Sequence, residues 1–430
     1  LIYKICKNIY GMVTAAGLHF KSVIEMLKKL GYTQADGDQT LFRNKEKNTT
    51  VFVYVDDGAL VGPTEIVLEL VRMIEKRFDL GMKDFMSEML GSRVVTTTEE
   101  ESTESRKDDD ENHEGWHDNI PKAKIKSIKQ DLAQYTKDLL KSTPVGQGNY
   151  YPRSTPIDIA LGESLEDNLP NFVNSYADRH VRKLTKKEQD DYEEMLRDYD
   201  FTNIVYRMLW ISRISRPDLS LAVSVVSKHL LGPPCYDAMR ALRQMLQYLL
   251  GTVEMGIIFH ADGNRKPIYY CDSNHPMGRP RLGYLCRLAD GPLDWGSKLA
   301  PVCSESTTES EIYAASEGLR KGTVIHADLV HVEIVNKDEL MAFVGDNDAC
   351  TTILGKSKDA LSVRAKHIGS RLYKAMERCS PDSEHRTATM ERVGTNDNLS
   401  DFFTKFQSRA LFISMRDCIM GISRELSKLC

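Results

Sequence analysis

The sequence of 430 residues lacks the features that assign a protein to the membrane, the secretory pathway or a disulfide-rich class. No apolar run approaches the roughly 20 residues that a membrane-spanning helix needs, so no membrane partner is expected. No charged-then-apolar leader is visible, which predicts an intracellular protein, in a cytoplasmic particle or in the nucleus, that is not secreted. The nine cysteines include no CxxC pair, and this favours reduced thiols over a disulfide framework or a zinc site.

What is present is the composition of a globular protein, 41% hydrophobic and 28% charged, over a length sufficient for two or three domains. The net charge of −5 is unevenly spread. Residues 96–119 contain ten acidic and two basic residues, a charge of −8, which leaves +3 for the rest of the chain. Such a segment repels itself and has little to bury, so we expect a disordered loop, with an acidic interaction tail as the alternative. The average charge therefore neither favours nor excludes a nucleic-acid partner.

The N-terminal part predicts a small mixed sheet with helices on one face. Residues 19–30 and 64–78 carry apolar residues at helical spacing. Residues 40–43 and 50–61 are rich in Val, Phe and Tyr, which predicts two strands joined by a polar turn. The opening LIYKICKNIYG resembles the middle of a fold, and we expect a fragment or a cleavage product of a longer chain.

Beyond the acidic segment the pattern is first helical and then rich in strands. Residues 162–200 are polar and charged and are expected to be partly disordered. Strand patterns begin at Gly256, and the turn residues of 261–266 predict a domain boundary there. The predicted helices cover residues 131–141, 204–214, 219–231 and 238–250, and the predicted strands carry GIIFHA, PIYYCDSN, RLGYLCRL, LDWGS and MAFVGD.

Two adjacent carboxylates, Asp56 and Asp57, lie inside the apolar run VFVYVDDGALVG. Buried charges are costly unless an opposite charge neutralises them, and a divalent cation, which prefers oxygen ligands, would do so. A solvated turn is the alternative for such a pair. The apolar flanks favour a hairpin tip that lies against a core.

This run and its neighbours resemble the reverse transcriptase of copia-type retrotransposons. The resemblance covers nearly the whole chain apart from the acidic segment and residues 162–200, and it is carried by the order of the motifs LGYTQADGDQTLF, VFVYVDDGALVG, FDLGMKDFMSEMLGSRV, YRMLWISRISRPDLSLAVSVVSKHLLGPP and MRALRQMLQYLLGTVEMGIIF. It implies an α/β (α+β) fold, in which a partial reverse-transcriptase palm with a helical thumb or connection precedes an RNase H-like mixed sheet flanked by helices. The implied segments are the partial reverse transcriptase (1–95), the acidic loop (96–119), the thumb- or connection-like helices (120–262), the RNase H-like domain (263–410) and a C-terminal tail (411–430).

Four further carboxylates match the copia-type RNase H in type and order, in the motifs YYCDSN, TTESEIYAASEG, FVGDNDACTTI and DNLSDFFTK. The resemblance implies that these acids are catalytic and hold Mg²⁺ or Mn²⁺, and that the YVDD pair has the same role in the polymerase remnant. Two cations roughly 3.5–4 Å apart can activate water and stabilise the leaving oxygen of a phosphodiester. The candidate catalytic and metal-binding residues are Asp272, Glu311, Asp346 and Asp401 for the RNase H, and Asp56 and Asp57 for the polymerase.

Two assignments within these motifs leave alternatives. Glu309 is the nearest rival of Glu311, which is preferred because it directly precedes an Ile-Tyr pair, as the family's Glu precedes its apolar pair. His367 in VRAKHIGSRL either contacts RNA or packs against the sheet, and packing is favoured.

The sequence also departs from the family pattern. After Asp272 the family has an acid and a tryptophan, whereas this chain has Ser273-Asn274-His275. Residues 13–17 are VTAAG, where the family has a Lys-Gln-Ala-Pro-Arg segment of the nucleotide pocket. The strand that carries the third polymerase Asp does not occur in the sequence, so polymerisation by this chain alone is not expected.

These observations predict an enzyme, a metal-dependent RNase H-type endonuclease that hydrolyses the RNA strand of RNA–DNA hybrids, joined to the remnant of an RNA-directed DNA polymerase. The expected partners are the hybrid, an RNA template with a DNA primer, and the rest of the Pol polyprotein. The alternative is a catalytically decayed or domesticated transposon relic with at most nucleic-acid binding. An unrelated two-domain interaction protein would require the ordered motifs to arise by chance. The distances among the four RNase H carboxylates distinguish the enzyme from the relic, because carboxylates that lie far apart would exclude the enzyme.

Overall fold

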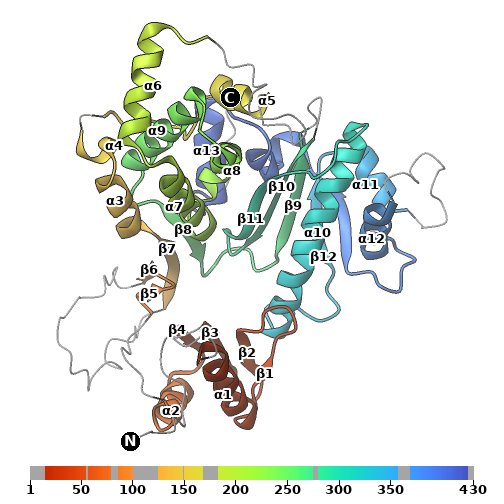
Figure 1. The fold of residues 1–430 in the computed structure, drawn as a ribbon. Helices are drawn as coiled ribbons and strands as arrows, with labels where there is room; N and C mark the ends of the chain where they lie inside the picture. Colours follow the sequence, from red (N-terminus) through yellow and green to blue (C-terminus); the bar gives the residue numbers. More distant parts are fainter. Residues whose placement is uncertain are drawn as a thin grey trace, which may run out of the picture. The chain divides into compact units, whose positions relative to one another are not determined.

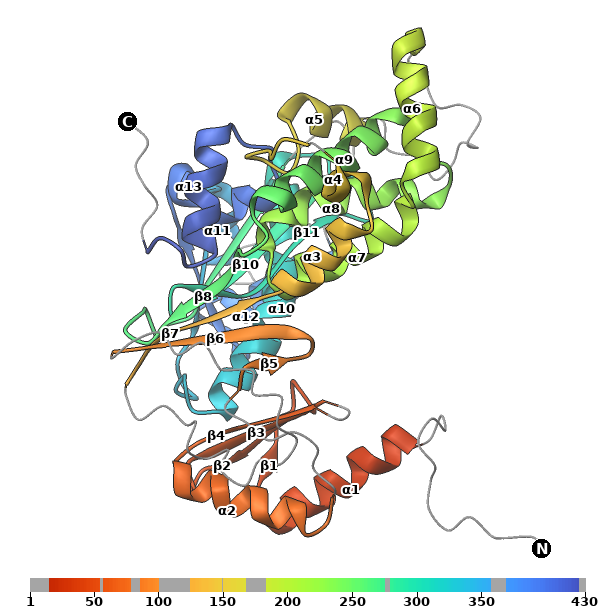
Figure 2. The same ribbon diagram turned by 90° about the vertical axis from the view of Figure 1, so that its left-hand side faces the viewer.

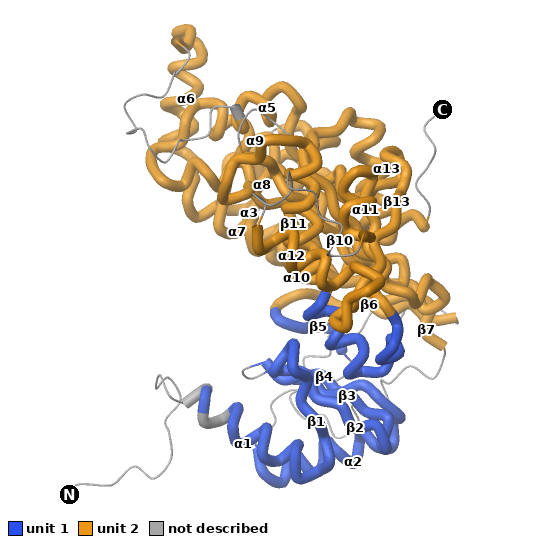
Figure 3. Tube along the Cα trace, turned by 90° about the vertical axis from the view of Figure 1, so that its right-hand side faces the viewer, with its two compact units in different colours: residues 1–90, 105–122, 323–339 blue, residues 91–104, 123–322, 340–430 orange. Residues whose placement is uncertain are grey.

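The computed structural model describes residues 15–54, 57–78, 86–99, 124–148, 150–167, 183–274, 279–356 and 369–424. The chain divides into two compact units (Figure 3): unit 1 contains residues 1–90, 105–122 and 323–339, and unit 2 contains residues 91–104, 123–322 and 340–430. Each unit combines helices with strands, and the predicted mixed α/β class is confirmed. The domain boundary predicted near residue 262 lies inside unit 2, and the assignment of the segments on its two sides stays a prediction.

Unit 1 is built on a four-stranded antiparallel sheet in the order β1-β2-β3-β4, with two helices on one of its faces (Figure 2). Its elements are α1 (Ala15–Lys29), β1 (Thr33–Gln34), β2 (Leu41–Asn44), β3 (Thr49–Tyr54), β4 (Asp57–Val61), α2 (Thr64–Glu75) and β5 (Glu88–Met89). Apolar side chains of both helices and of the sheet share one core. The predicted helices and the hairpin are confirmed, but a single strand over 50–61 is wrong, because the chain reverses and pairs Tyr54 with Asp57.

Unit 2 contains a five-stranded mixed sheet in the order β11-β10-β9-β12-β13. The first three strands are antiparallel neighbours, and β9, β12 and β13 are parallel neighbours. The strands are β9 (Ile268–Ser273), β10 (Arg281–Leu288), β11 (Gly291–Leu299), β12 (Met341–Gly345) and β13 (Ala388–Arg392). The predicted mixed sheet of about five strands is confirmed, and it is compatible with an RNase H-like fold.

Helices cover both faces of this sheet (Figure 1). On one face, the sheet residues Leu285 and Trp295 share a core with apolar residues of four helices, α7 (Phe201–Ile214), α8 (Ser220–Val226), α9 (Tyr236–Gly251) and α13 (Arg409–Ile419). On the other face α10 approaches closely, since a Cβ at Gly318 would lie 2.9 Å from the ring of Phe343. The helices along and after the sheet are α10 (Thr307–His331), α11 (Asp348–Leu354), α12 (Gly369–Cys379), η7 (Thr395–Asp397), η8 (Leu399–Phe403) and α13 (Arg409–Ile419).

A second, antiparallel sheet and a group of helices precede this sheet in unit 2. The second sheet includes β6 (Ser92–Thr98), β7 (Ile125–Asp131) and β8 (Gly256–His260). The helices are α3 (Ala133–Lys141), α4 (Pro144–Gln147), α5 (Ile159–Asp167), α6 (Lys186–Asp198), α7 (Phe201–Ile214), η3 (Pro217–Leu219), α8 (Ser220–Val226), η4 (Ser227–Leu231) and α9 (Tyr236–Gly251). Among the described residues, no helix is both long and apolar enough to span a membrane.

Two segments are more regular than their composition predicts. Residues 162–200 contain the end of α5 and the whole of α6, which begins with a capping box in which Thr185 and Glu188 satisfy each other's backbone N–H groups. Thr96–Thr98, assigned to the acidic loop, form the end of β6 and pair with β7, so that assignment is wrong for these residues. The rest of the predicted loop, 100–119, lies outside the described residues.

The RPD motif forms a buried ion pair in unit 2. The guanidinium of Arg216, only 1% exposed, donates to Asp218 with a shortest distance of 2.8 Å between Nη2 and Oδ2. The hydroxyl of Tyr248 donates to the same Oδ2 at 2.6 Å, and Arg216 Nη1 donates to the carbonyl of Thr252 at 2.9 Å. Burial opposes ionisation of Asp218, but Arg216 outweighs it and holds the pKa of the carboxyl below its ordinary value. The motif therefore joins η3 to α9 in the core.

Candidate metal centre

Parallel pairing of β9 and β12 brings two predicted site residues to the same edge of the sheet. The register matches Tyr270 with Val344. Asp272 lies two residues after the first, and Asp346 lies two residues after the second. The two carboxylates are therefore level with each other at the carboxyl ends of neighbouring strands, far apart in sequence but adjacent in the fold.

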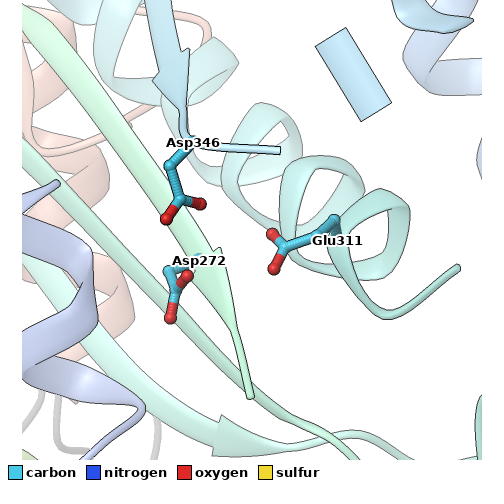
Figure 4. Close-up of side chains that lie close together, drawn as sticks. All are labelled: Asp272, Glu311 and Asp346. Carbon is cyan, nitrogen blue, oxygen red and sulfur yellow. The ribbon is translucent and has the colours of Figure 1, made fainter. Parts of the chain in front are cut away.

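Glu311 reaches this edge from the first turns of α10. The backbone N–H of Ser273 donates to Glu311 Oε1 at 3.3 Å. Asp272, Glu311 and Asp346 each offer one carboxylate oxygen, and these oxygens all lie within 4.8 Å of one another. Figure 4 shows the three carboxylates directed toward one another from β9, α10 and the end of β12. The structure therefore clusters three of the four RNase H acids expected from the sequence.

The rival Glu309 has a different environment. It is buried, and its carboxylate accepts from the backbone N–H of Glu305 at 2.6 Å and from the hydroxyl of Tyr313. These contacts stabilise the first turn of α10. Glu311 is the glutamate that meets the two aspartates, as its position before Ile-Tyr suggests.

Asp401, the fourth acid, joins the site through a lysine. It lies in η8, a 3₁₀ turn, and its Oδ1 is 3.0 Å from Nζ of Lys405. The same Nζ is 3.6 Å from Oδ2 of Asp272, which also accepts a hydrogen bond from the hydroxyl of Thr404. Sequence reasoning missed Lys405 and Thr404, although the spacing of four residues between Asp401 and Lys405 typically places two side chains on one side of a helical turn.

Burial and mutual repulsion disfavour ionisation of Asp272 and Glu311. The pKa of Asp272 is raised well above its ordinary value by burial and by the charges of Asp401 and Glu311. Burial raises the pKa of Glu311 to about 7, with Asp346 adding to the shift. Burial opposes the charge of Lys405 as well, but Asp272 and Asp401 outweigh it and raise the pKa of the ammonium. The single positive charge of Lys405 is thus too small to neutralise the carboxylates of the cluster when they are ionised.

A hard divalent cation such as Mg²⁺ or Mn²⁺ suits this donor set, because carboxylate oxygens are the ligands that these ions prefer. Asp272, Glu311 and Asp346 would hold it. The binding of a cation there, and the assignment of these residues as ligands, stay predictions.

Cation affinity should therefore depend on pH. Because a cation displaces protons from Glu311, whose pKa is about 7, and from Asp272, whose pKa is also raised, Mn²⁺ affinity should rise at least about tenfold per pH unit as the pH approaches neutrality. Calorimetric titration across this range, in buffers that differ in ionisation enthalpy, would measure the affinity and the released protons. An affinity independent of pH, without proton release, would contradict the assignment of Glu311 as a ligand.

The polymerase pair is described only in part. Asp57 is exposed at the start of β4, where its Oδ2 accepts from the backbone N–H of Leu90 at 3.3 Å. Asp56 lies outside the described residues, as does His367. Their predicted roles stay predictions.

Comparison with known proteins links the chain to transposons. No protein-family model matches it, and no solved structure matches it. It is 24% identical, over 424 residues, to the retrovirus-related Pol polyprotein from transposon TNT 1-94 of Nicotiana tabacum, covering 96% of this chain and 28% of that protein. It is 22% identical, over 324 residues, to a transposon Ty5-1 protein of Saccharomyces cerevisiae, covering 74% of this chain and 88% of that protein. It is 30% identical, over 130 residues, to the secreted RxLR effector protein 161 of Plasmopara viticola, covering 29% of this chain and 91% of that protein.

Matches to transposon polyproteins thus extend over most of the chain. The chain is similar to copia-type retrotransposon Pol polyproteins, at 21–24% identity. This similarity supports a transposon-related function, as the ordered motifs predict. It spans little more than a quarter of the tobacco polyprotein, so the activities of such a polyprotein come to this chain only as proposals.

Proposed function

We propose that this chain hydrolyses the RNA strand of RNA–DNA hybrids with Mg²⁺ or Mn²⁺. The observation that carries the proposal is the convergence of Asp272, Glu311 and Asp346, from three separate elements, within 4.8 Å. Buried carboxylates that repel one another are destabilising without a compensating charge, so a fold that assembles them favours a cation-dependent role. The family's order of acidic motifs supports phosphodiester hydrolysis as that role.

Each residue has a definable part in such a reaction. When bound, the cation would lower the pKa of a water molecule and stabilise negative charge on the phosphate. Asp272, Glu311 and Asp346 would hold it. The hydroxyl of Thr404 orients Asp272, and the N–H of Ser273 orients Glu311, so both carboxylates are positioned before any ligand arrives.

The departure from the family after Asp272 does not argue for decay. The amide of Asn274 donates from Nδ2 to the carbonyl of Thr404 at 3.2 Å and accepts at Oδ1 from the N–H of Arg281 at 2.6 Å. It thereby ties β10 to the residue that orients Asp272. His275 lies outside the described residues. These contacts support an enzyme over a relic with at most nucleic-acid binding.

Selection of the hybrid would follow from duplex shape and the 2′-hydroxyl rather than from base sequence. For the polymerase remnant, the expected association with an RNA template and a DNA primer is proposed as binding alone. Association with the rest of a Pol polyprotein is part of the same proposal.

The test is cleavage by the purified chain of an end-labelled RNA–DNA hybrid, with a DNA duplex of the same sequence as control. The RNA strand should be cut in Mg²⁺ or Mn²⁺, the DNA duplex should stay intact, and removal of the cation with a chelator should stop cleavage. An intact hybrid in both cations, from a correctly folded protein, would overturn the proposal in favour of the relic.

A further inference from the structure

We propose that the ammonium group of Lys405 takes the place of a second divalent cation, so that the site binds one such cation and not two. The acids divide into two groups. Asp272, Glu311 and Asp346 present oxygens within 4.8 Å of one another. Asp401 instead directs Oδ1 to Lys405 Nζ at 3.0 Å, and the same Nζ lies 3.6 Å from Asp272 Oδ2. Asp272 therefore borders the carboxylate cluster on one side and a fixed positive charge on the other.

The position of Lys405 is determined from its backbone outward. Its N–H and that of Thr404 both donate to the carbonyl of Asp401, at 3.0 and 3.2 Å, which closes the turn after η8. Thr404 and Phe403 are buried, so this turn is anchored in the core. The side chain of Lys405 keeps 41% of its surface exposed. The ammonium is thus held beside two carboxylates while remaining open to a phosphate from solvent.

Electrostatics make the ammonium and a second cation alternatives. A divalent ion that bridged Asp272 and Asp401 would have to displace Lys405, because like charges a few Å apart repel strongly beside the buried carboxylate of Asp272. An ammonium stabilises phosphate oxygens as a point charge. In hydrolysis it would stabilise the departing 3′-oxygen, which is the part that a second cation plays in a two-metal site. This role in cleavage rests on the proposed function, whereas the number of bound cations does not.

The experiment is a calorimetric titration of the full chain with Mn²⁺. The same titration of the Asp272→Asn variant is subtracted as background. Asp272 borders both cation positions, the one among Asp272, Glu311 and Asp346 and the one that Lys405 occupies beside Asp401, so this variant should bind at neither. Weak binding of Mn²⁺ to the acidic segment is the same in both titrations and is therefore removed by the subtraction. One Mn²⁺ per unmodified chain is expected. Lys405→Met should bind two, since it leaves Asp401 and Asp272 without their counter-charge, whereas Lys405→Arg should bind one. The matched control is Lys298→Met, which removes a lysine of β11 whose partner, Glu317, lies 3.5 Å away and outside the site. This variant should bind one Mn²⁺.

Two Mn²⁺ per unmodified chain would overturn the inference, and so would a count of one in Lys405→Met. Cleavage is followed in parallel. At Mn²⁺ concentrations that fill only the position among Asp272, Glu311 and Asp346, Lys405→Met should cleave the hybrid about a hundredfold more slowly than the unmodified chain. Higher Mn²⁺ concentrations should restore the rate. One bound Mn²⁺ without hybrid cleavage would overturn the proposed function and leave the cation count standing. Cleavage with two bound ions would overturn the inference and leave the proposed function standing.

Discussion

Replacing Glu311 by Gln should abolish cleavage and, at the same time, stabilise the cation-free protein above neutral pH. Removing one ligand of a catalytic metal site typically costs several kcal/mol of transition-state stabilisation, on the order of a thousandfold or more in rate. The shape is kept, since the amide oxygen of Gln can still accept from the N–H of Ser273. Activity and stability should therefore change in opposite directions.

The stability gain follows from the pKa of Glu311, which burial raises from 4.5 to about 7. A carboxyl with a raised pKa stabilises the fold at pH values below its unfolded pKa, and this contribution is lost as pH rises through the folded value. Relative to the unmodified chain, Glu311→Gln should gain up to about 3 kcal/mol at pH 8 and almost nothing near pH 4.

Urea unfolding at several pH values, with a chelator present, would measure this difference. Glu317→Gln on the same helix is the matched control, because burial there is outweighed by Arg320 and Lys298, which lower the pKa of Glu317. That variant should lose a little stability near neutrality, by at most about 1 kcal/mol, and keep its cleavage activity. A loss of stability in Glu311→Gln at pH 8 would contradict the electrostatic account of the cluster.

Replacing Asp218 by Asn should destabilise unit 2 by about 3–5 kcal/mol, because it leaves the guanidinium of Arg216 buried without its counter-charge. Both side chains are almost completely inaccessible, at 0% for the carboxylate and 1% for the guanidinium. Tyr248 would also lose an ionised acceptor. Equilibrium denaturation followed by far-UV circular dichroism would measure the change.

The double variant Arg216→Met with Asp218→Leu should recover only part of that loss, since it removes the uncompensated charge but leaves the Tyr248 hydroxyl and the Thr252 carbonyl without these partners. Asp237→Asn supplies the partly exposed control. Its ion pair with Arg240, at 3.2 Å, joins side chains that are 27% and 43% exposed, and its loss should cost less than about 1 kcal/mol. Equal losses of unfolding free energy in Asp218→Asn and Asp237→Asn would show that the buried Arg216–Asp218 pair stabilises the protein no more than an ion pair at the surface.

Elements with a strong local pattern can be predicted from this sequence, whereas their pairing cannot. The apolar spacing of residues 19–30 is sufficient for α1, and the run before Asp272 is sufficient for β9. The β-rich run 50–61 alone predicts one continuous strand, whereas the hairpin tip expected from the apolar flanks of the acidic pair agrees with the reversal that pairs Tyr54 with Asp57. Thr96–Thr98 likewise join β6 through pairing with β7, although the charge of the neighbouring residues favours a loop.

In the candidate site, too, the residues can be predicted from the sequence, whereas the distances between them cannot. Asp272, Glu311 and Asp346 can be selected by resemblance and by their places at the ends of apolar elements. Their distances depend on the parallel register of β9 with β12, which no local pattern encodes. The pairing of Asp401 with Lys405 is local, at a spacing of four residues, but its meaning depends on Asp272 lying beside it.

The chemical ends of the cleaved RNA test the central claim most directly. Attack by water with departure of the 3′-oxygen leaves a 5′-phosphate on one fragment and a 3′-hydroxyl on the other. Mass spectrometry of a hybrid digested in Mg²⁺ should find these termini with the unmodified chain and no fragments with Asp346→Asn. Fragments ending in a 2′,3′-cyclic phosphate, or cleavage that survives Asp346→Asn, would show that the three-carboxylate site is not where the RNA is cut.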